Sequence, residues 1–164
     1  MLHREAQDTR ADRKLFCTLW REFLEEMNDD PPSDYNIQAA KDLMMFYTRN
    51  EVQGIVVFAM EGDTVVGVGM AGLQPPGIWQ GFDDGYGLTG TLWGIYIRPE
   101  YRRKGMSHAL LDWGQTHPKM KGIKGYWASV RNTSEAAMQN ALRYSDGKSK
   151  ALQIFGHSSE GMEE

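Results

Sequence analysis

The residues best suited to chemistry lie in one basic, glycine-containing stretch between two apolar patterns. Arg102, Arg103 and Lys104 are followed by Gly105 and by the small residue Ser107. Where such a stretch opens a helix, the first N–H groups have no partner within the helix and carry a partial positive charge, so they bind phosphate well. Glycine lets a phosphate group approach the main chain, and the cationic side chains add donors. The stretch therefore indicates a site for a phosphate or a diphosphate.

The alternative interpretation is an ordinary helix start with solvated charges, and the spacing of Arg102 and Gly105 alone favours it. The residues on either side favour a site. An apolar run over residues 88–97 predicts a buried strand, which Pro99 ends. Residues 102–116 then predict a helix with an apolar stripe, which Pro118 closes. A buried strand thus runs through a short turn into a basic helix start, which is a less generic pattern than the charges alone.

The rest of the chain predicts a mixed fold of the α/β (α+β) class. Before the basic stretch we expect a strand over residues 2–6, a helix capped by Asp8 or Thr9, a helix that starts at Ser33 or Asp34, and a hairpin of strands 54–60 and 64–73. After it we expect a strand over 123–130, a helix capped by Asn132 and a short strand over 151–155. The order β-α-α-β-β-β-α-β-α-β predicts a mixed β-sheet flanked by helices on both faces. We assign residues 1–157 to a single domain and residues 158–164 to a polar tail.

Composition and charge exclude several classes of protein. The 18 basic and 22 acidic side chains give a net charge of −4, which argues against broad nucleic-acid or anionic-membrane binding. The single cysteine, Cys17, excludes an internal disulfide and a CxxC metal cluster, and we interpret it as a core thiol. No stretch approaches the ~20 apolar residues of a membrane span, and the start lacks the apolar core of a signal peptide. We expect a soluble, cytoplasmic protein without a bound metal.

The segment around the basic stretch resembles the signature of the GNAT N-acetyltransferase family. That signature is R/Q-x-x-G-x-G/A, after a strand that ends in the phrase V-x-P-x-Y/F-R. This chain has Ile97-Arg98-Pro99-Glu100-Tyr101-Arg102-Arg103-Lys104-Gly105-Met106-Ser107, with serine in place of the final glycine or alanine. The resemblance is specific over about residues 88–132 and covers most of the chain by the order of its elements. It implies a GNAT-like fold and an N-acetyltransferase that moves an acetyl group from acetyl-CoA to a primary amine by direct attack in a ternary complex.

The resemblance also implies where acetyl-coenzyme A would bind. The pantetheine arm would lie along residues 92–97 and pair with the main chain of Ile95, Tyr96 and Ile97. Gly94 fits the bulge expected in that strand. The diphosphate would lie on N–H groups of the helix start, with Arg102 adding charge; the residues concerned are Arg103, Lys104, Gly105, Met106, Ser107 and His108. Asn132 matches an asparagine that family members use near the cofactor, and it is equally well explained as a helix cap.

The catalytic groups of the family are only partly matched. Many members place a glutamate on the strand before the cofactor turn, whereas residues 89–93 contain no acid. Asp83 and Asp84 in the preceding loop, or His157 or His3, are alternative bases, and an amine of low pKa would need none. Tyr144 is the only phenol after Asn132, at a longer spacing than in the family. We predict it as the general acid that protonates the departing thiolate, with a packing or capping role as the alternative.

The acceptor site should be built by residues 28–35, the loop 74–87 and the C-terminal end. Acidic residues in these segments favour a cationic amine, and the aromatic residues Trp79, Phe82 and Tyr86 could form a lid or a partner surface. We expect a small-molecule amine or a protein as the acceptor, and we leave a homodimer open. The rival function is a non-catalytic module of the same fold that binds a coenzyme A compound or a protein partner. Nucleobase modification is a third reading, which the acidic balance disfavours.

Overall fold

The computed structural model describes residues 2–28, 31–74, 88–129 and 153–155. Six strands form one sheet in the order of the sequence, β1-β2-β3-β4-β5-β6. They are β1 (Leu2–Glu5), β2 (Gly54–Glu61), β3 (Thr64–Gly72), β4 (Leu88–Ile97), β5 (Ile123–Ser129) and β6 (Gln153–Phe155). Neighbouring strands are antiparallel from β1 to β4 and parallel from β4 to β6. The predicted mixed sheet is therefore confirmed.

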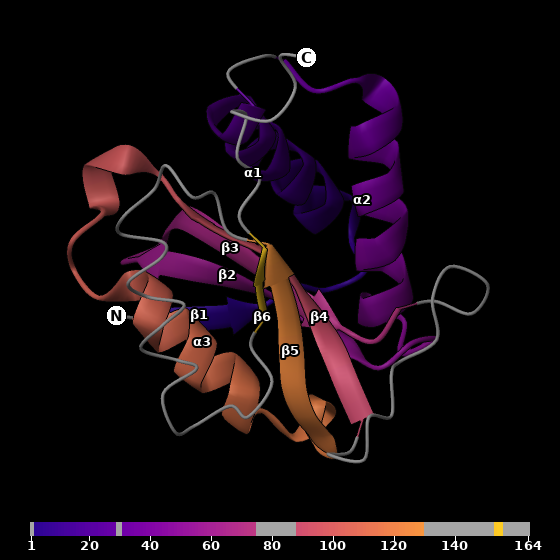
Figure 1. Cartoon of the computed structure of the whole chain (residues 1–164). Helices are drawn as coiled ribbons and strands as arrows, with labels where there is room; N and C mark the ends of the chain where they lie inside the picture. The colour runs from indigo at the N-terminus through magenta and orange to yellow at the C-terminus, as the bar shows by residue number, and fades with distance from the viewer. Residues whose placement is uncertain (1, 29–30, 75–87, 130–152, 156–164) are drawn as a thin grey trace, which may run out of the picture.

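Helices cover both faces of the sheet, as predicted (Figure 1). Helices α1 (Arg10–Asn28) and α2 (Asp34–Thr48) pack on one face, against a core cluster that includes Val56 and Phe58 of β2. Helix α3 (Met106–Thr116) packs on the other face, against a cluster that includes Ile55 and Val57. Successive side chains of a strand point to opposite faces, so β2 needs apolar residues at nearly every position. This explains its continuous apolar run.

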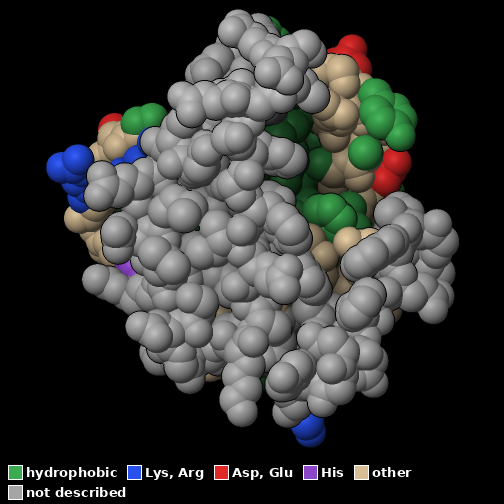
Figure 2. All heavy atoms as spheres, viewed as in Figure 1, with side chains coloured by type: hydrophobic (Ala, Val, Ile, Leu, Met, Phe, Trp, Pro, Cys, Tyr) green, Lys and Arg blue, Asp and Glu red, His purple; other side chains and the backbone are tan. Residues whose placement is uncertain are grey.

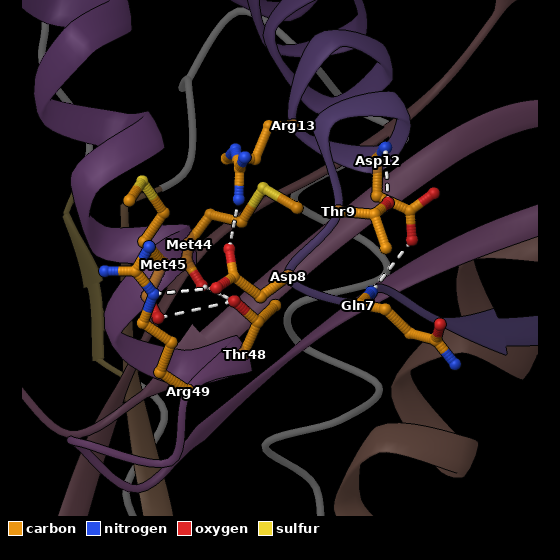
Figure 3. Close-up of polar contacts among 9 residues, drawn as sticks. All are labelled: Gln7, Asp8, Thr9, Asp12, Arg13, Met44, Met45, Thr48 and Arg49. Atoms are coloured by element: carbon orange, nitrogen blue, oxygen red, sulfur yellow. Dashed lines mark hydrogen bonds and ion pairs between the residues drawn. The ribbon is translucent and has the colours of Figure 1, made fainter.

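The start of α1 is fastened to the end of α2 by one carboxylate (Figure 3). Asp8 accepts from Arg13 in the first turn of α1 and from Nε of Arg49, just after α2, at 2.8 Å. Thr9 caps α1, because its Oγ1 accepts from the Asp12 N–H at 3.1 Å. The two helices are thus held together as one layer over the sheet.

The hairpin of β2 and β3 turns through Gly62 and Asp63, with Glu61 opposite Thr64. Gly62 has φ +58°, which suits the first position of a tight hairpin turn. The helix predicted after Asn132 lies outside the described residues. Within the described residues, two short 3-10 turns flank α3, Pro99–Tyr101 before it and Pro118–Met120 after it.

Candidate functional site

The C-terminal half of β4 has an open edge on the side of β5, because its pairing with β5 ends earlier than its pairing with β3. Strand β4 pairs with β3 as far as Ile97, opposite Gly67, but with β5 only as far as Leu92, opposite Ala128. Among the described strands, residues 93–97 therefore have a neighbour on one side only. The two strands run side by side in Figure 1, and β4 then continues to the turn that leads into α3.

The main-chain groups that face this open edge follow from the hydrogen-bond pattern. The N–H of Arg98 donates to the C=O of Val66 at 2.9 Å, on the β3 side. In an antiparallel pair alternate residues bond to the neighbour, so Tyr96 also faces β3, whereas Ile95 and Ile97 face away. The C=O of Ile97 accepts from Nε of Arg102 at 2.7 Å, which agrees with this direction. Of the three predicted β4 residues, Ile95 and Ile97 present their N–H groups to the open edge and Tyr96 does not.

A β-bulge lies at the point where the edge opens. Met70 of β3 is opposite Gly94, and Ala71 is opposite Leu92, so Trp93 is the extra residue. The bulge was predicted at Gly94, and the structure has it at the preceding residue, Trp93. A Cβ on Gly94 would come within 2.5 Å of the Phe23 ring, so the glycine lets α1 pack closely over the bulge.

The helix start after β4 lies four residues later than the sequence predicts. Helix α3 begins at Met106, not at Arg102, because Arg103 has φ 62° and Gly105 has φ 75°. Both values are left-handed, and an α-helix cannot contain them. Gly105 is the N-cap and offers no side chain to the N–H groups of the first turn. A Cβ on Gly105 would meet no heavy atom of the described residues within 4 Å, so none of these residues fills the space beside these groups.

The basic side chains of the turn are held by carboxylates of distant elements. Arg98 donates two hydrogen bonds to Glu22 of α1, at 3.0 and 2.9 Å. Arg102 donates to Glu26 of α1 at 2.6 Å, and its guanidinium lies 5.7 Å from the centre of the Tyr96 ring. Burial and the carboxylates of Glu22 and Glu26 raise the pKa of Tyr96 to about 12. Helix α1 therefore fixes the position of the turn.

Lys104 and Arg103 differ in their surroundings. Lys104 donates to Glu61 at the end of β2, at 3.2 Å, and lies over the Tyr101 ring. Arg103 is exposed. Of the three consecutive cations, Arg102 and Lys104 each have a carboxylate partner.

We expect Arg102→Ala and Arg103→Ala to weaken coenzyme A binding in different ways. Arg102 holds Ile97 and Glu26, so its loss should loosen the turn and lower affinity roughly tenfold, with the salt dependence of the wild type. Arg103 is exposed beside the open helix start, so its loss should flatten the dependence of affinity on ionic strength. Titrations at several salt concentrations measure both slopes. A flattened slope for Arg102→Ala would instead show that this side chain contacts the diphosphate.

Sequence reasoning did not identify Glu22 and Glu26 as parts of the site. They are four residues apart on α1, so they share a face of the helix, and their partners Arg98 and Arg102 are also four residues apart. This matched spacing is the one signal in the sequence that could have found them.

Three other residues named from the sequence, His3, Cys17 and Asp34, lie among the described residues. His3 lies on β1, which β2 and β3 separate from β4, and its ring centre is 6.2 Å from that of Trp113, so it is not a base for this site. Cys17 is half-buried against the first core cluster, and burial raises its pKa. Asp34 pairs with Arg21 at 3.5 Å. The remaining predicted groups lie outside the described residues: Asn132, Tyr144, His157, Asp83, Asp84, Trp79, Phe82 and Tyr86.

No group of three His, Cys, Asp or Glu side chains in the described ranges is arranged to hold a metal ion. None of the helices described is both long and apolar enough to cross a membrane.

Comparison with solved structures shows a similar fold in proteins described as acetyltransferases or predicted acetyltransferases. A predicted acetyltransferase with acetyl-CoA from Clostridium acetobutylicum is 16% identical, over 99% of this chain and 96% of that chain, with a TM-score of 0.66. The PaiA N-acetyltransferase from Thermoplasma acidophilum, in complex with coenzyme A, is 15% identical over 90% and 95%, with a TM-score of 0.61. A ribosomal-protein-alanine N-acetyltransferase from Brucella melitensis is 20% identical over 90% and 83%, with a TM-score of 0.62.

At these identities the structures show a shared fold and nothing more. No curated protein matches the chain by sequence. The family model of the acetyltransferase (GNAT) family, however, matches residues 19–143. The match runs from α1 beyond β5 and includes the open edge, the bulge and the turn. The chain therefore belongs to the acetyltransferase (GNAT) family.

Proposed function

We propose that the protein transfers the acetyl group of acetyl-coenzyme A to a primary amine by direct attack in a ternary complex. The observation that carries the proposal is the continuity of the open β4 edge with the uncapped start of α3. Ile95 and Ile97 present main-chain donors on that edge, and the turn that follows presents Gly105 and the first N–H groups of the helix. One extended ligand with amide groups and a diphosphate would use both.

The residues present fit coenzyme A. A Cβ on Gly105 would meet no atom of the described residues within 4 Å, so no described side chain crowds the main chain where a diphosphate would approach. The diphosphate would lie on the N–H groups from Gly105 to His108, with Arg103 adding charge. The pantetheine arm would pair with Ile95 and Ile97 as a neighbouring strand does. When bound, acetyl-coenzyme A supplies an acetyl group that is activated as a thioester.

Catalysis would rest on positioning and on main-chain polarisation. The N–H of Ile95, next to the bulge, is the donor best placed to polarise the thioester carbonyl. Glu22 and Glu26, which approach β4 from α1, already bind arginines. Tyr96, with its pKa raised to about 12, stays protonated at neutral pH. None of these three side chains is a ready base, so we propose that the acceptor enters as the free amine. We also propose that Tyr144, the general acid predicted from the sequence, supplies the proton to the departing thiolate.

The acceptor would approach beside α1 and α2. Figure 2 shows hydrophobic side chains gathered around these helices at the upper right of the view, with acidic side chains next to them. On α2, Tyr35 is 81% exposed and Phe46 is 37% exposed. This apolar surface suits a small amine or a segment of a protein, so both belong in a substrate panel.

We expect coenzyme A to raise the melting temperature of the protein. A ligand at a hundred times its dissociation constant adds about 2.7 kcal/mol to the free energy of unfolding. For a chain of this length that corresponds to roughly 5–10 °C. A melting scan with millimolar acetyl-coenzyme A measures the shift, and free-thiol detection with amines, peptides and proteins measures transfer. No shift would contradict the proposal. A shift without thiol release for any acceptor would indicate the non-catalytic coenzyme A-binding module instead.

A further inference from the structure

Tyr47 lies in the last turn of α2, and its ring is enclosed by the ends of β2 and β3. The residue is 1% exposed. Gly54 and Gly72 are cross-strand partners. A Cβ on Gly54 would come within 2.2 Å of the Tyr47 ring, and one on Gly72 within 2.6 Å. Two facing glycines thus form a slot that holds the ring in one position.

The Tyr47 hydroxyl joins two segments that border the candidate site. It donates to the C=O of Leu73, just after β3, at 2.7 Å. It accepts from Nε1–H of Trp93, the bulged residue of β4, at 2.9 Å. An indole N–H can only donate, and losing its acceptor in a half-buried position is costly. The hydroxyl therefore holds the Trp93 side chain in place.

The bulge determines which main-chain groups of β4 face the open edge. On one side of Trp93 the register is Gly94 to Met70, and on the other side it is Leu92 to Ala71. Without the extra residue, one half of β4 would shift by one position against β3. Such a shift turns every N–H of that half to the opposite edge. The direction of the Ile95 N–H therefore depends on a bulge that stays at Trp93.

We propose that Tyr47 is a positioning residue for acetyl transfer, because it holds Trp93 and so keeps the Ile95 N–H directed to the open edge. The inference rests on the proposed function, which assigns this N–H to the thioester carbonyl. Burial raises the pKa of Tyr47 above its ordinary value, so the hydroxyl keeps its proton at neutral pH. Its contribution is the geometry of a donor and not the transfer of a proton.

A double-mutant cycle tests the link between the two residues. We expect Tyr47→Phe and Trp93→Phe each to lower kcat roughly tenfold to hundredfold, the scale of a displaced catalytic group. Coenzyme A affinity should fall much less than kcat, because the helix start that would hold the diphosphate is untouched. The double variant should be no slower than the slower single variant, because both remove one interaction. Tyr126→Phe, which removes another buried tyrosine hydroxyl, is the control and should retain the wild-type kcat.

Hydrogen exchange gives a readout that does not depend on activity. In the protein without cofactor, Tyr47→Phe should speed exchange of the Trp93 indole N–H and of the main-chain N–H groups of residues 92–94, with β1 and β2 unchanged. Unchanged exchange in β4, additive losses of kcat, or equal losses of kcat and coenzyme A affinity would each overturn the proposal. If the wild type transferred no acetyl group, the proposed function would fail, and the exchange rates would still decide whether Tyr47 holds the bulge.

Discussion

Gly105→Asp is expected to abolish coenzyme A binding while the protein remains folded. The carboxylate would occupy the open space beside the first N–H groups of α3, where the diphosphate would lie. It would also bind those N–H groups itself, as aspartate does at an N-cap, and repel the phosphates. We expect affinity to fall by more than a hundredfold, which calorimetry with coenzyme A measures.

Gly62→Asp is a matched control for this variant. Gly62 and Gly105 have similar left-handed φ angles, 58° and 75°, and a Cβ at either position meets no heavy atom within 4 Å in the part of the chain that the structure describes. The two substitutions therefore impose a similar backbone cost of roughly 1–2 kcal/mol and add the same charge. Only Gly105→Asp should affect coenzyme A. Equal loss of affinity in both variants would place the phosphate site elsewhere.

Ile95→Pro is expected to lower kcat by roughly 10²–10³-fold, the effect of removing one donor from a developing oxyanion. Proline has no N–H, and its fixed φ is tolerated where the missing donor faces away from the neighbouring strand. The N–H of Ile95 faces the open edge, so its loss should leave the pairing of β3 and β4 intact. Steady-state kinetics with a reactive amine provides the measurement.

Ile95→Ala separates the side chain from the main chain in this test. Both variants lose the aliphatic contacts of Ile95 with the α3 core cluster, but only the proline variant loses the N–H. We expect Ile95→Ala to fold less stably and to turn over at nearly the wild-type rate. If alanine slowed catalysis as much as proline, the N–H would have no role in it.

The sequence predicted the strands well because their signals are local. Strand β4 begins and ends where the apolar run begins and ends, with Pro99 just beyond it. The predicted start of α3 was wrong because tertiary contacts hold the preceding turn in another conformation. Arg102, Arg103 and Lys104 are good helix formers, but Arg102 bonds to Ile97 and to Glu26, which is 76 residues away along the chain. Local propensity contains no information about such partners.

The sequence predicted where the candidate site lies but not which residues hold it in place. Gly94 and Gly105 were identified because glycine at a strand bulge or a helix start has few explanations. The slot of Gly54 and Gly72 was not identified, because it depends on a tyrosine that arrives from another helix. In the same way, the sequence alone predicts that Glu22, a carboxylate on an amphipathic helix, is solvated. Its partner Arg98 is 76 residues away along the chain.

The sheet order has a consequence for the way the chain folds. Five consecutive pairs of strands are neighbours both in sequence and in space, and they differ greatly in the length of chain that must be closed. The β2–β3 pair closes over a two-residue turn, whereas Leu2 of β1 meets Met60 across both helices. Closing a longer loop costs more entropy and slows the step that forms it. The hairpin should therefore nucleate the sheet, with β1 added only after α1 and α2 have packed against β2 and β3.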